Sequence, residues 1–272
     1  MKKLFIILTI IFLVPLNLPA QLQIRTHKEK ISDFPNKITK VVLTGNDTLD
    51  IPIREAVKNF WTISAYEICS KEEFESIRSN DNYYFLAVGG NSDGVRSWYL
   101  VKGGDFDKKK GLASMVAVAD VPVCPADGYT GREEVLLPVL ICNLQYEAAK
   151  AVKIKYTGVG GNISNIKKAK DLPLIVCEDE LSPEIGLAEK EFCEGKGIRI
   201  ASAEDADGYF YTGDQAAVCF VIGPRKPARG QTFYVYLVDS STYGLYYIKK
   251  RKVSSSGRGV LKEDLKAFAK GR

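Results

Sequence analysis

A block of 32 residues near the start of the chain returns 132 positions later without a gap. The block is Val42–Glu73, its second copy is Leu174–Asp205, and nine positions are identical in the two copies. The identical pairs are Asp47/Asp179, Leu49/Leu181, Ile53/Ile185, Ala56/Ala188, Lys58/Lys190, Phe60/Phe192, Ile68/Ile200, Ser70/Ser202 and Glu72/Glu204. A period of this length is too long for one unit of a solenoid and is typical of a duplicated domain. The repeat therefore predicts two related domains in one chain.

The shared residues of the block mostly specify helices. Ile53, Ala56 and Phe60 are spaced at i, i+3 and i+7, which places them on one side of a helix. Their counterparts in the second copy are Ile185, Ala188 and Phe192. Both copies are therefore expected to bury an apolar helix stripe in a core.

Helix starts are predicted at two kinds of position. Asp50 and Ser182 are good N-cap residues, and each has a proline close behind it. Ser70 and Ser202 are each followed three residues later by a carboxylate, as in a capping box. These signals describe folding and carry no chemistry.

Beyond the block, the two halves continue with the same order of elements. Each half is expected to follow strand, helix, strand, short helix, three strands and a closing helix, which is an α/β fold with mixed sheets. The first strand–helix–strand unit should be a parallel crossover, and the later strands, joined by short turns, should pair antiparallel. This order is similar to that of thioredoxin-like folds, but the chain has no C-x-x-C motif, so the redox chemistry of such folds is not expected.

The expected organisation is an internal duplication with two pseudo-symmetric domains. The segments are a signal peptide at 1–20, an N-terminal arm at 21–38, a first repeat domain at 39–156, a linker at 157–170 and a second repeat domain at 171–272. The first domain closes with a long apolar segment from Glu134 to about Lys153, for which a helix buried between the copies is expected. A strand over the first part of that segment is the alternative.

The first 20 residues have the features of a secretory signal peptide. Two lysines precede an apolar run from Leu4 to Val14, and Ala20 is a suitable residue before a cleavage site. The run is shorter than the roughly 20 residues of a membrane-spanning helix, so an uncleaved anchor is the weaker alternative. No cysteine follows it for lipid attachment. We therefore expect an exported protein of a bacterial envelope, periplasmic or secreted, with no transmembrane segment after cleavage.

Residue content excludes several kinds of catalytic site. After signal cleavage the chain has one histidine, His27, so a Ser-His-Asp triad, a Cys-His dyad or a His-ligated metal is not expected. Six cysteines permit up to three disulfides, but none has zinc-site or redox spacing. The glycine-rich segments lack phosphate-loop and dinucleotide motifs. No metal, cofactor or catalytic residue is therefore predicted.

Positive charge and tyrosines gather near the C-terminus. Between Tyr246 and Arg272 there are nine Lys or Arg residues against two acids. One interpretation is a solvated strand edge followed by an amphipathic helix. The other is a docking face for an anionic envelope polymer or an envelope protein, whereas export argues against nucleic acid. Tyrosines of the late strands would then line a glycan- or peptide-binding face beside the basic strand.

The candidate ligand-binding residues follow from these patterns. Asp47 and Asp179 come just after a short apolar strand in each copy, where open α/β sheets often form a ligand crevice. An Asx-turn that leads into the helix is the alternative role for these aspartates. The remaining candidates belong to the basic strand, and they are Tyr246, Lys249, Lys250, Arg251 and Lys252.

The leading hypothesis is a non-catalytic exported binding or envelope-assembly protein. It would use the cleft between the two domains or the tyrosine-rich C-terminal sheet. The alternative is a carboxylate-based hydrolase that acts on an envelope polymer, because glycoside cleavage needs only two acidic groups at a set separation. Two convergent, partly buried carboxylates in an open cleft would favour the hydrolase.

Overall fold

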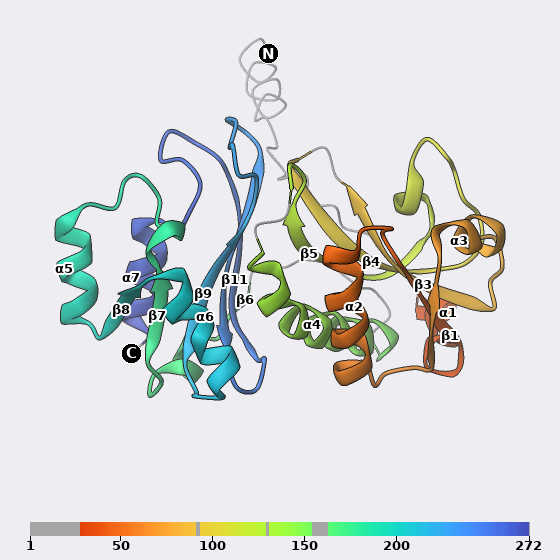
Figure 1. Ribbon diagram of the computed structural model, residues 1–272, viewed down its shortest axis with the longest axis horizontal. Coiled ribbons are helices and arrows are strands. Elements are labelled where there is room, and N and C mark those ends of the chain that lie inside the picture. The colour runs from red at the N-terminus through yellow and green to blue at the C-terminus, as the bar shows by residue number, and fades with distance from the viewer. Residues whose placement is uncertain (1–27, 91–92, 129–130, 154–162, 272) are drawn as a thin grey trace, which may run out of the picture.

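Two mixed β-sheets, with helices between them and on their outer faces, make up the computed structural model (Figure 1). The structure describes residues 28–90, 93–128, 131–153 and 163–271. The predicted signal peptide and His27 lie outside the described residues, as do positions 157–162 of the predicted linker.

The first sheet has five strands in the order β2-β1-β3-β4-β5. The strands are β1 (Ile38–Val42), β2 (Tyr66–Cys69), β3 (Tyr83–Gly90), β4 (Val95–Lys102) and β5 (Val116–Pro125). β1 pairs parallel with β2 and β3, whereas β4 pairs antiparallel with β3 and β5.

The second sheet has six strands in the order β6-β11-β10-β9-β7-β8. The strands are β6 (Ile163–Ser164), β7 (Leu174–Cys177), β8 (Ile198–Ala201), β9 (Ala217–Ile222), β10 (Thr232–Asp239) and β11 (Leu245–Lys252). β7 pairs parallel with β8 and β9, and the other pairs are antiparallel. Apart from the added β6, the strand order and the pairing senses match those of the first sheet. The predicted α/β class, with two similar mixed-sheet units, is therefore confirmed, while a common origin by duplication remains a prediction.

Helices lie between the sheets and on both outer faces (Figure 1). The helices between the sheets are α2 (Asp47–Phe60), α4 (Glu133–Lys153) and α6 (Ala203–Thr212). The outer helices are α3 (Lys71–Ile77) on the first sheet, and α5 (Leu187–Gly195) and α7 (Lys262–Lys270) on the second. The short helices are α1 (Lys28–Ile31), η1 (Phe34–Asn36), η2 (Gly111–Ser114), η3 (Ile166–Ala169) and η4 (Glu178–Glu180).

The predicted long helix between the halves is confirmed as α4. Leu140, Ile141, Leu144 and Ala148 are fully buried in a core that contains residues from both sheets. The alternative of a strand over its first part is wrong. Over Glu134–Lys153, α4 is also long and apolar enough to cross a membrane. Its burial between two sheets instead fits the core helix of a globular protein.

The two sheets face each other through faces that do not correspond. In each half, the first crossover helix and the closing helix lie on one face of the sheet, and the second crossover helix lies on the other. The first sheet turns α2 and α4 toward the centre, whereas the second sheet turns α6, its second crossover helix, toward the centre (Figure 1). The two similar halves therefore contact each other through different faces.

The sequence repeat is offset by three residues in its first part. Ile68 and Ile200, identical in the ungapped repeat, pair with Val41 and Val176 on the central strands of their sheets. Val41 and Val176 are separated by 135 positions, while the repeat has a shift of 132. The segment that joins the two parallel strands is therefore three residues shorter in the second half.

This offset changes which helix residues are buried. Ile53 and Ala56 of α2 are buried, and Phe60 packs against the same core, so the predicted stripe is confirmed in the first copy. Their counterparts Ala188 and Phe192 are exposed, so the stripe predicted for the second copy is wrong.

The second copy differs because its helix begins later. Pro183 and Gly186 interrupt the segment that follows β7, and α5 starts only at Leu187. The buried residue of α5 is Cys193, which packs in the outer core of the second sheet. Because α5 starts later, the residues that match the buried stripe of α2 lie on a different side of the helix. Another side chain, that of Cys193, therefore reaches the core.

The two predicted serine caps are confirmed. The hydroxyl oxygens of Ser70 and Ser202 accept hydrogen bonds at 3.1 Å from the backbone N–H groups of Glu73 and Asp205. They start α3 and α6, as the capping sequences indicate.

The other two predicted caps are wrong. The N-cap of α2 is Asn46, and Asp50 is a buried residue inside the helix. The Asp50 carboxylate accepts hydrogen bonds from the backbone of Thr44 and Gly45, so it holds the turn that follows β1. Ser182 is buried and lies before the start of α5.

Residues before the first sheet are part of its core. Ile31 and Phe34 are fully buried. The Asp33 carboxylate accepts hydrogen bonds from the Tyr84 hydroxyl at 2.5 Å and from the Lys102 ammonium group at 2.7 Å. The C-terminal part of the predicted arm is thereby fixed to the first sheet.

All six cysteines are free thiols. Five of them are buried, and Cys142 is partly exposed. The disulfides that the sequence permitted are not formed, and the buried cysteines serve as small apolar residues in the cores.

Candidate functional site

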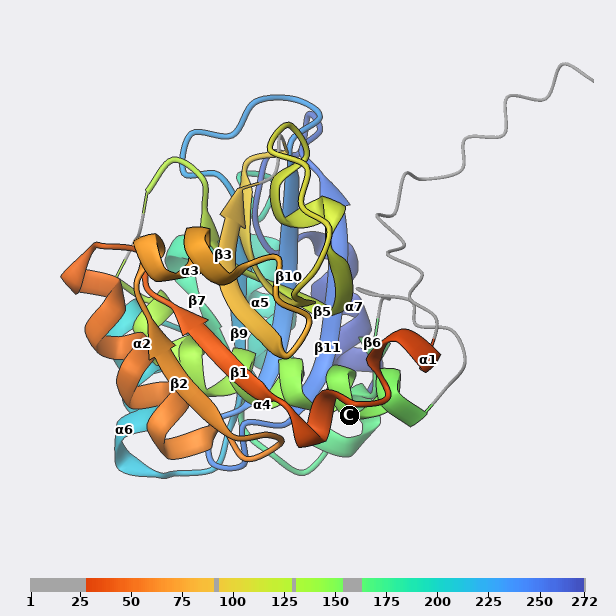
Figure 2. The ribbon, with the colours of Figure 1, turned by 90° about the vertical axis from the view of Figure 1, so that its right-hand side faces the viewer.

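A pocket of about 600 Å³ opens where the two sheets meet. Its walls are β5 of the first sheet, the C-terminal half of α4 and the turn between β10 and β11. Figure 2 shows α4, β5, β10 and β11 in the middle of the molecule. The side chains that bear polar groups or aromatic rings are Asp120, Cys142, Asn143, Tyr146, Glu147, Lys150, Asn165, Lys168, Tyr234, Thr242, Tyr243 and Tyr246. Pockets of this size between two domains are common positions for ligand sites.

Asp120 is a carboxylate in an otherwise apolar part of β5. It stands opposite Tyr99 of β4, and its neighbours Ala119 and Val121 are buried. Burial raises the pKa of Asp120 to about 6, although the positive charge of Lys250 opposes the shift. Within the described part of the chain, the Asp120 carboxylate accepts no hydrogen bond.

Glu147 supplies a second carboxylate to the same pocket from α4. Burial raises its pKa, and Lys150, one turn along the helix with its ammonium group 3.9 Å away, opposes the shift. Among the described residues, no side chain or backbone group donates a hydrogen bond to Glu147. The pocket thus contains two carboxylates to which no described residue donates a hydrogen bond.

Four tyrosines bring aromatic surface to the pocket. Tyr146 of α4 is 63% exposed, so most of its ring is open to solvent. Tyr234 of β10 and Tyr246 of β11 are half-buried, and the ring of Tyr243 packs edge-on against Phe60 with the ring centres 5.0 Å apart. The pocket therefore combines ring faces with polar groups.

Asp239 fixes the turn that carries Tyr243 and Tyr246. Its carboxylate accepts hydrogen bonds from both the backbone and the hydroxyl of Ser241, from the backbone of Thr242 and from the Tyr246 hydroxyl. Burial opposes ionisation, but these hydrogen bonds outweigh it and hold the pKa of Asp239 below its usual value. Tyr243 has a φ of 57°, a left-handed conformation that is unusual for a residue with a side chain.

The predicted site residues of β11 lie on both faces of the second sheet, because successive side chains of a strand point to opposite faces. Tyr246 lines the pocket. Lys250 lies on the same face of β11, with its ammonium group 5.9 Å from the centre of the Tyr234 ring, and its charge acts on Asp120. These are the two members of the predicted set that the structure brings near the pocket.

The other residues of the basic strand point elsewhere or are paired. Arg251 binds Asp264 of α7 at 2.7 Å, on the outer face of the sheet, and Lys249 alternates with Lys250 along the strand. Lys252 pairs with Asp93 at 2.9 Å. The basic run of the sequence is therefore divided between the two faces of β11.

Asp47 and Asp179 are both exposed near the ends of parallel strands. Asp47 is the first residue of α2, and Asp179 lies in η4 after β7. The two aspartates belong to different sheets, and neither lines the pocket. The three-residue offset also means that they do not occupy equivalent places in the two halves.

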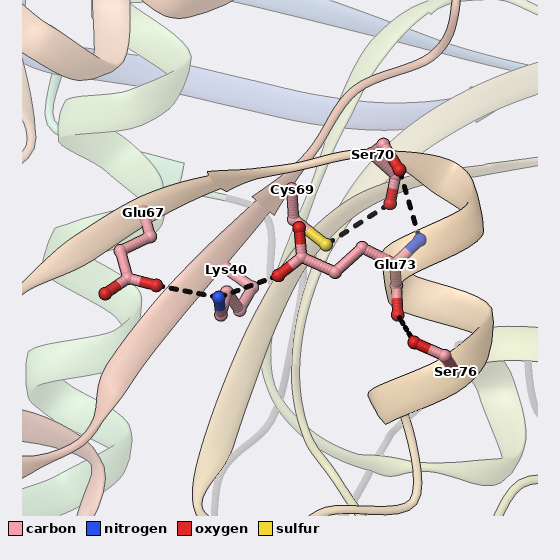
Figure 3. Close-up of polar contacts among 6 residues, drawn as sticks. All are labelled: Lys40, Glu67, Cys69, Ser70, Glu73 and Ser76. Atoms are coloured by element: carbon pink, nitrogen blue, oxygen red, sulfur yellow. Dashed lines mark hydrogen bonds and ion pairs between the residues drawn. The ribbon is translucent and has the colours of Figure 1, made fainter.

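A second polar cluster lies on the outer face of the first sheet (Figure 3). The Lys40 ammonium group is 2.7 Å from Glu67 and 2.8 Å from Glu73, and these two hydrogen bonds raise the pKa of Lys40. The neighbouring Cys69 donates to the carbonyl oxygen of Ser70, and burial raises the pKa of its thiol to about 11. A protonated thiol is a poor nucleophile, so this cluster reads as a structural ion pair that joins β1, β2 and α3.

A third cluster joins the two halves. Arg132, the residue before α4, is 2.8 Å from Glu180 and 2.9 Å from Asp207 of α6. Burial raises the pKa of Glu180 to about 7, against the effect of Arg132 and Arg258. Arg132 belongs to the first half, and Glu180 and Asp207 belong to the second. We therefore interpret this cluster as a structural contact between the two halves.

Comparison with known proteins found no matching family model, no matching curated protein and no matching solved structure. The interpretation of the pocket therefore depends on its own residues. Among the described residues, no group of three or more His, Cys, Asp or Glu side chains is arranged to hold a metal ion.

Sequence reasoning missed Asp120, Glu147 and Tyr146. A signal existed for Asp120, because a carboxylate interrupts the apolar run Met115–Val123. Glu147 and Tyr146 carry no comparable signal, since they resemble the ordinary polar side of a helix.

Proposed function

We propose that this protein is an exported, non-catalytic binding protein that holds a ligand in the pocket between its two sheets. The observation that carries the proposal is a pocket of about 600 Å³ in which two carboxylates, to which no described residue donates a hydrogen bond, converge with amides and tyrosine rings. Buried polar groups in proteins are normally hydrogen-bonded, so carboxylates without donors are best explained by a ligand that supplies them. Export to the bacterial envelope is the part of the proposal that depends on residues 1–20 alone.

A thermal-shift series tests this function. The chain from residue 21 is heated with glycans, peptides, nucleotides and anionic polymers, in parallel with Tyr146→Ala and Tyr211→Ala. Tyr211 is a matched control, because it is also an exposed helix tyrosine but does not line this pocket. At 100 times its dissociation constant, a ligand stabilises the native state by about 2.7 kcal/mol.

We expect one ligand class to raise the melting temperature of the native protein and of Tyr211→Ala, and to raise that of Tyr146→Ala much less. If every stabilising ligand acts equally on both variants, the pocket is not the binding site and the proposal is wrong.

The second candidate function is a carboxylate-based hydrolase. It is favoured by one observation, namely that Asp120 and Glu147 share a pocket and both have raised pKa values. A general acid must hold its proton near neutral pH, and the pKa of Asp120 at about 6 satisfies that requirement.

Release of reducing ends from envelope polysaccharides tests the hydrolase. If this function is correct, wild-type protein releases reducing ends, and Asp120→Asn and Glu147→Gln each lower the rate by about 100-fold or more. Unchanged polymer after prolonged incubation with wild-type protein would leave the binding function as the better account.

A further inference from the structure

The pocket between the sheets presents carboxylate oxygens to which no described residue donates a hydrogen bond. An ionised carboxylate has about four acceptor positions, and the described protein groups fill none of those of Asp120 or Glu147. A ligand that suits this pocket must therefore bring several hydrogen-bond donors.

Lysine side chains already lie near these carboxylates. Lys150 is 3.9 Å from Glu147, Lys250 acts on Asp120, and Lys168 also lines the pocket. A purely cationic ligand would meet these lysines, and a phosphate-rich ligand would meet the two carboxylates. A neutral ligand avoids both kinds of repulsion.

The remaining lining groups suit hydroxyl groups on an otherwise carbon-rich ring. Asn143, Asn165 and Thr242 each offer donors and acceptors, so they can pair with a hydroxyl in either direction. The exposed ring of Tyr146 offers a flat apolar surface at the rim, against which the C–H face of a sugar ring can pack. An aliphatic lipid would satisfy the tyrosine surface but leave the carboxylates unpaired.

We infer that the pocket binds a neutral saccharide, whose hydroxyl groups donate to Asp120 and Glu147 while one ring face covers Tyr146. This inference rests on the proposed binding function and adds the ligand class. Hydrogen bonds from hydroxyls to ionised carboxylates are among the stronger neutral-to-charged contacts in proteins. The fixed turn held by Asp239 keeps Tyr243 and Tyr246 in place before the ligand arrives, which lowers the cost of ordering the site.

Isothermal titration calorimetry with defined tetrasaccharides tests the inference. The probes are cellotetraose, maltotetraose, xylotetraose and chitotetraose, with tetragalacturonate as a charged arm and a tetrapeptide mixture as a non-saccharide arm. The proteins are the chain from residue 21, Tyr146→Ala and Glu147→Gln, with Tyr211→Ala and Glu55→Gln as matched controls that line the smaller groove beside α2 and α6.

We expect at least one neutral tetrasaccharide to bind, with affinity lowered about tenfold or more by Tyr146→Ala and by Glu147→Gln, the equivalent of roughly 1.4 kcal/mol. The two control variants should bind as the wild type does. Circular dichroism melting of each variant shows whether a loss reflects unfolding.

Three other outcomes would overturn the inference. Tight binding of tetragalacturonate with no neutral binding would show that charge recognition governs the pocket. Pocket-dependent binding of peptides alone would retain the proposed binding function and reject the saccharide. Saccharide binding that Tyr146→Ala and Glu147→Gln leave unchanged would place the sugar elsewhere, and would also remove this support for the pocket as the functional site.

Discussion

At the scale of one residue, Asp120 shows that a polar group in a pocket can lower the stability of the fold. A carboxylate in an apolar strand loses hydration, and no described donor replaces the lost water. Its charge is tolerated because the side chain faces the pocket and because Lys250 of β11 lies close enough to act on it. In the proposed binding function, Asp120 serves the ligand at a cost in stability.

Replacement of Asp120 by Asn is predicted to stabilise the protein above neutral pH. A carboxyl group whose pKa is raised on folding contributes stability below its unfolded pKa, and this contribution is lost as pH rises through the folded value of about 6. Asp120→Asn should therefore raise the free energy of unfolding by about 2 kcal/mol at pH 8 and by little at pH 4. Urea denaturation at the two pH values measures this difference.

The neighbouring groups define the control for this experiment. Among the described residues, the charged or titratable side chains that interact with Asp120 are Lys250, Tyr99, Tyr234 and Tyr236. Lys250→Met should destabilise the protein at pH 8 more than it does in the Asp120→Asn background, because in the wild type the carboxylate also loses the compensating charge of Lys250. An Asp120→Asn variant that is less stable than wild type at pH 8 would contradict the assignment of Asp120 as a desolvated acid.

At this scale, the sequence predicted residues that act through their near neighbours. Ser70 and Ser202 cap their helices as expected, because capping depends on residues three positions away. Tyr246 was predicted as a site residue from its place in a tyrosine-rich strand, and it lines the pocket. Glu147 could not be found in the same way, since what makes it unusual is the approach of the second sheet.

At the scale of elements, α2 and α5 show what an ungapped sequence repeat can conceal. The two helices have matching sequence spacing, yet α2 buries Ala56 and α5 exposes Ala188. The strand pairing of Val41 and Val176 reveals the three-residue offset that causes the difference. Local sequence similarity could predict the presence of both helices, whereas the buried side of α5 depends on where the chain leaves β7.

A matched pair of substitutions tests this difference. Ala56→Leu should lower the free energy of unfolding by about 1–3 kcal/mol, because it adds three carbon atoms to a filled core. Ala188→Leu should change it by no more than about 0.5 kcal/mol, because the side chain is exposed. Chemical denaturation of both variants measures the two values. Equal destabilisation would mean that the two helices present the same side to a core, as the ungapped repeat predicts.

Arg132 forms a polar contact between elements of the two halves. Its guanidinium group joins the start of α4 to Glu180 and to Asp207 of α6, and all three side chains are largely buried. Removal of one partner from a buried ion pair leaves an uncompensated charge, which is more costly than removal of the whole set.

Arg132→Met is therefore predicted to destabilise the protein by about 3–5 kcal/mol, while the triple variant Arg132→Met/Glu180→Gln/Asp207→Asn should be less destabilised than Arg132→Met alone. Thermal and urea denaturation of the single and triple variants measure the coupling. A triple variant that is less stable than the single variant would show that hydrogen bonding, and not unpaired charge, is the main contribution of the cluster.

At the scale of the whole molecule, the two similar sheets share one central core. The core between them contains Ile53 and Leu144 from the first half together with Val218 and Tyr236 from the second. The sequence predicted two units and a buried helix between them, and both expectations are confirmed. The contact between non-corresponding faces of the two sheets was not predictable. Two halves with the same order of elements give no information about which faces of their sheets meet.

The shared core predicts that neither half folds alone. Separation of residues 28–153 from residues 163–272 would expose the face of α4 that meets the second sheet and the face of the second sheet that receives it. At about 25 cal/mol for each Å² of apolar surface exposed, newly exposed apolar surface of about 200–600 Å² is enough to offset the 5–15 kcal/mol that separates folded from unfolded proteins. Each half, expressed alone, should show little near-ultraviolet circular dichroism and bind a hydrophobic dye, whereas the intact chain should unfold in one cooperative transition. A half that gives a well-dispersed amide spectrum and a cooperative melt of its own would contradict this prediction, and would mean that the central core is an interface between independent domains.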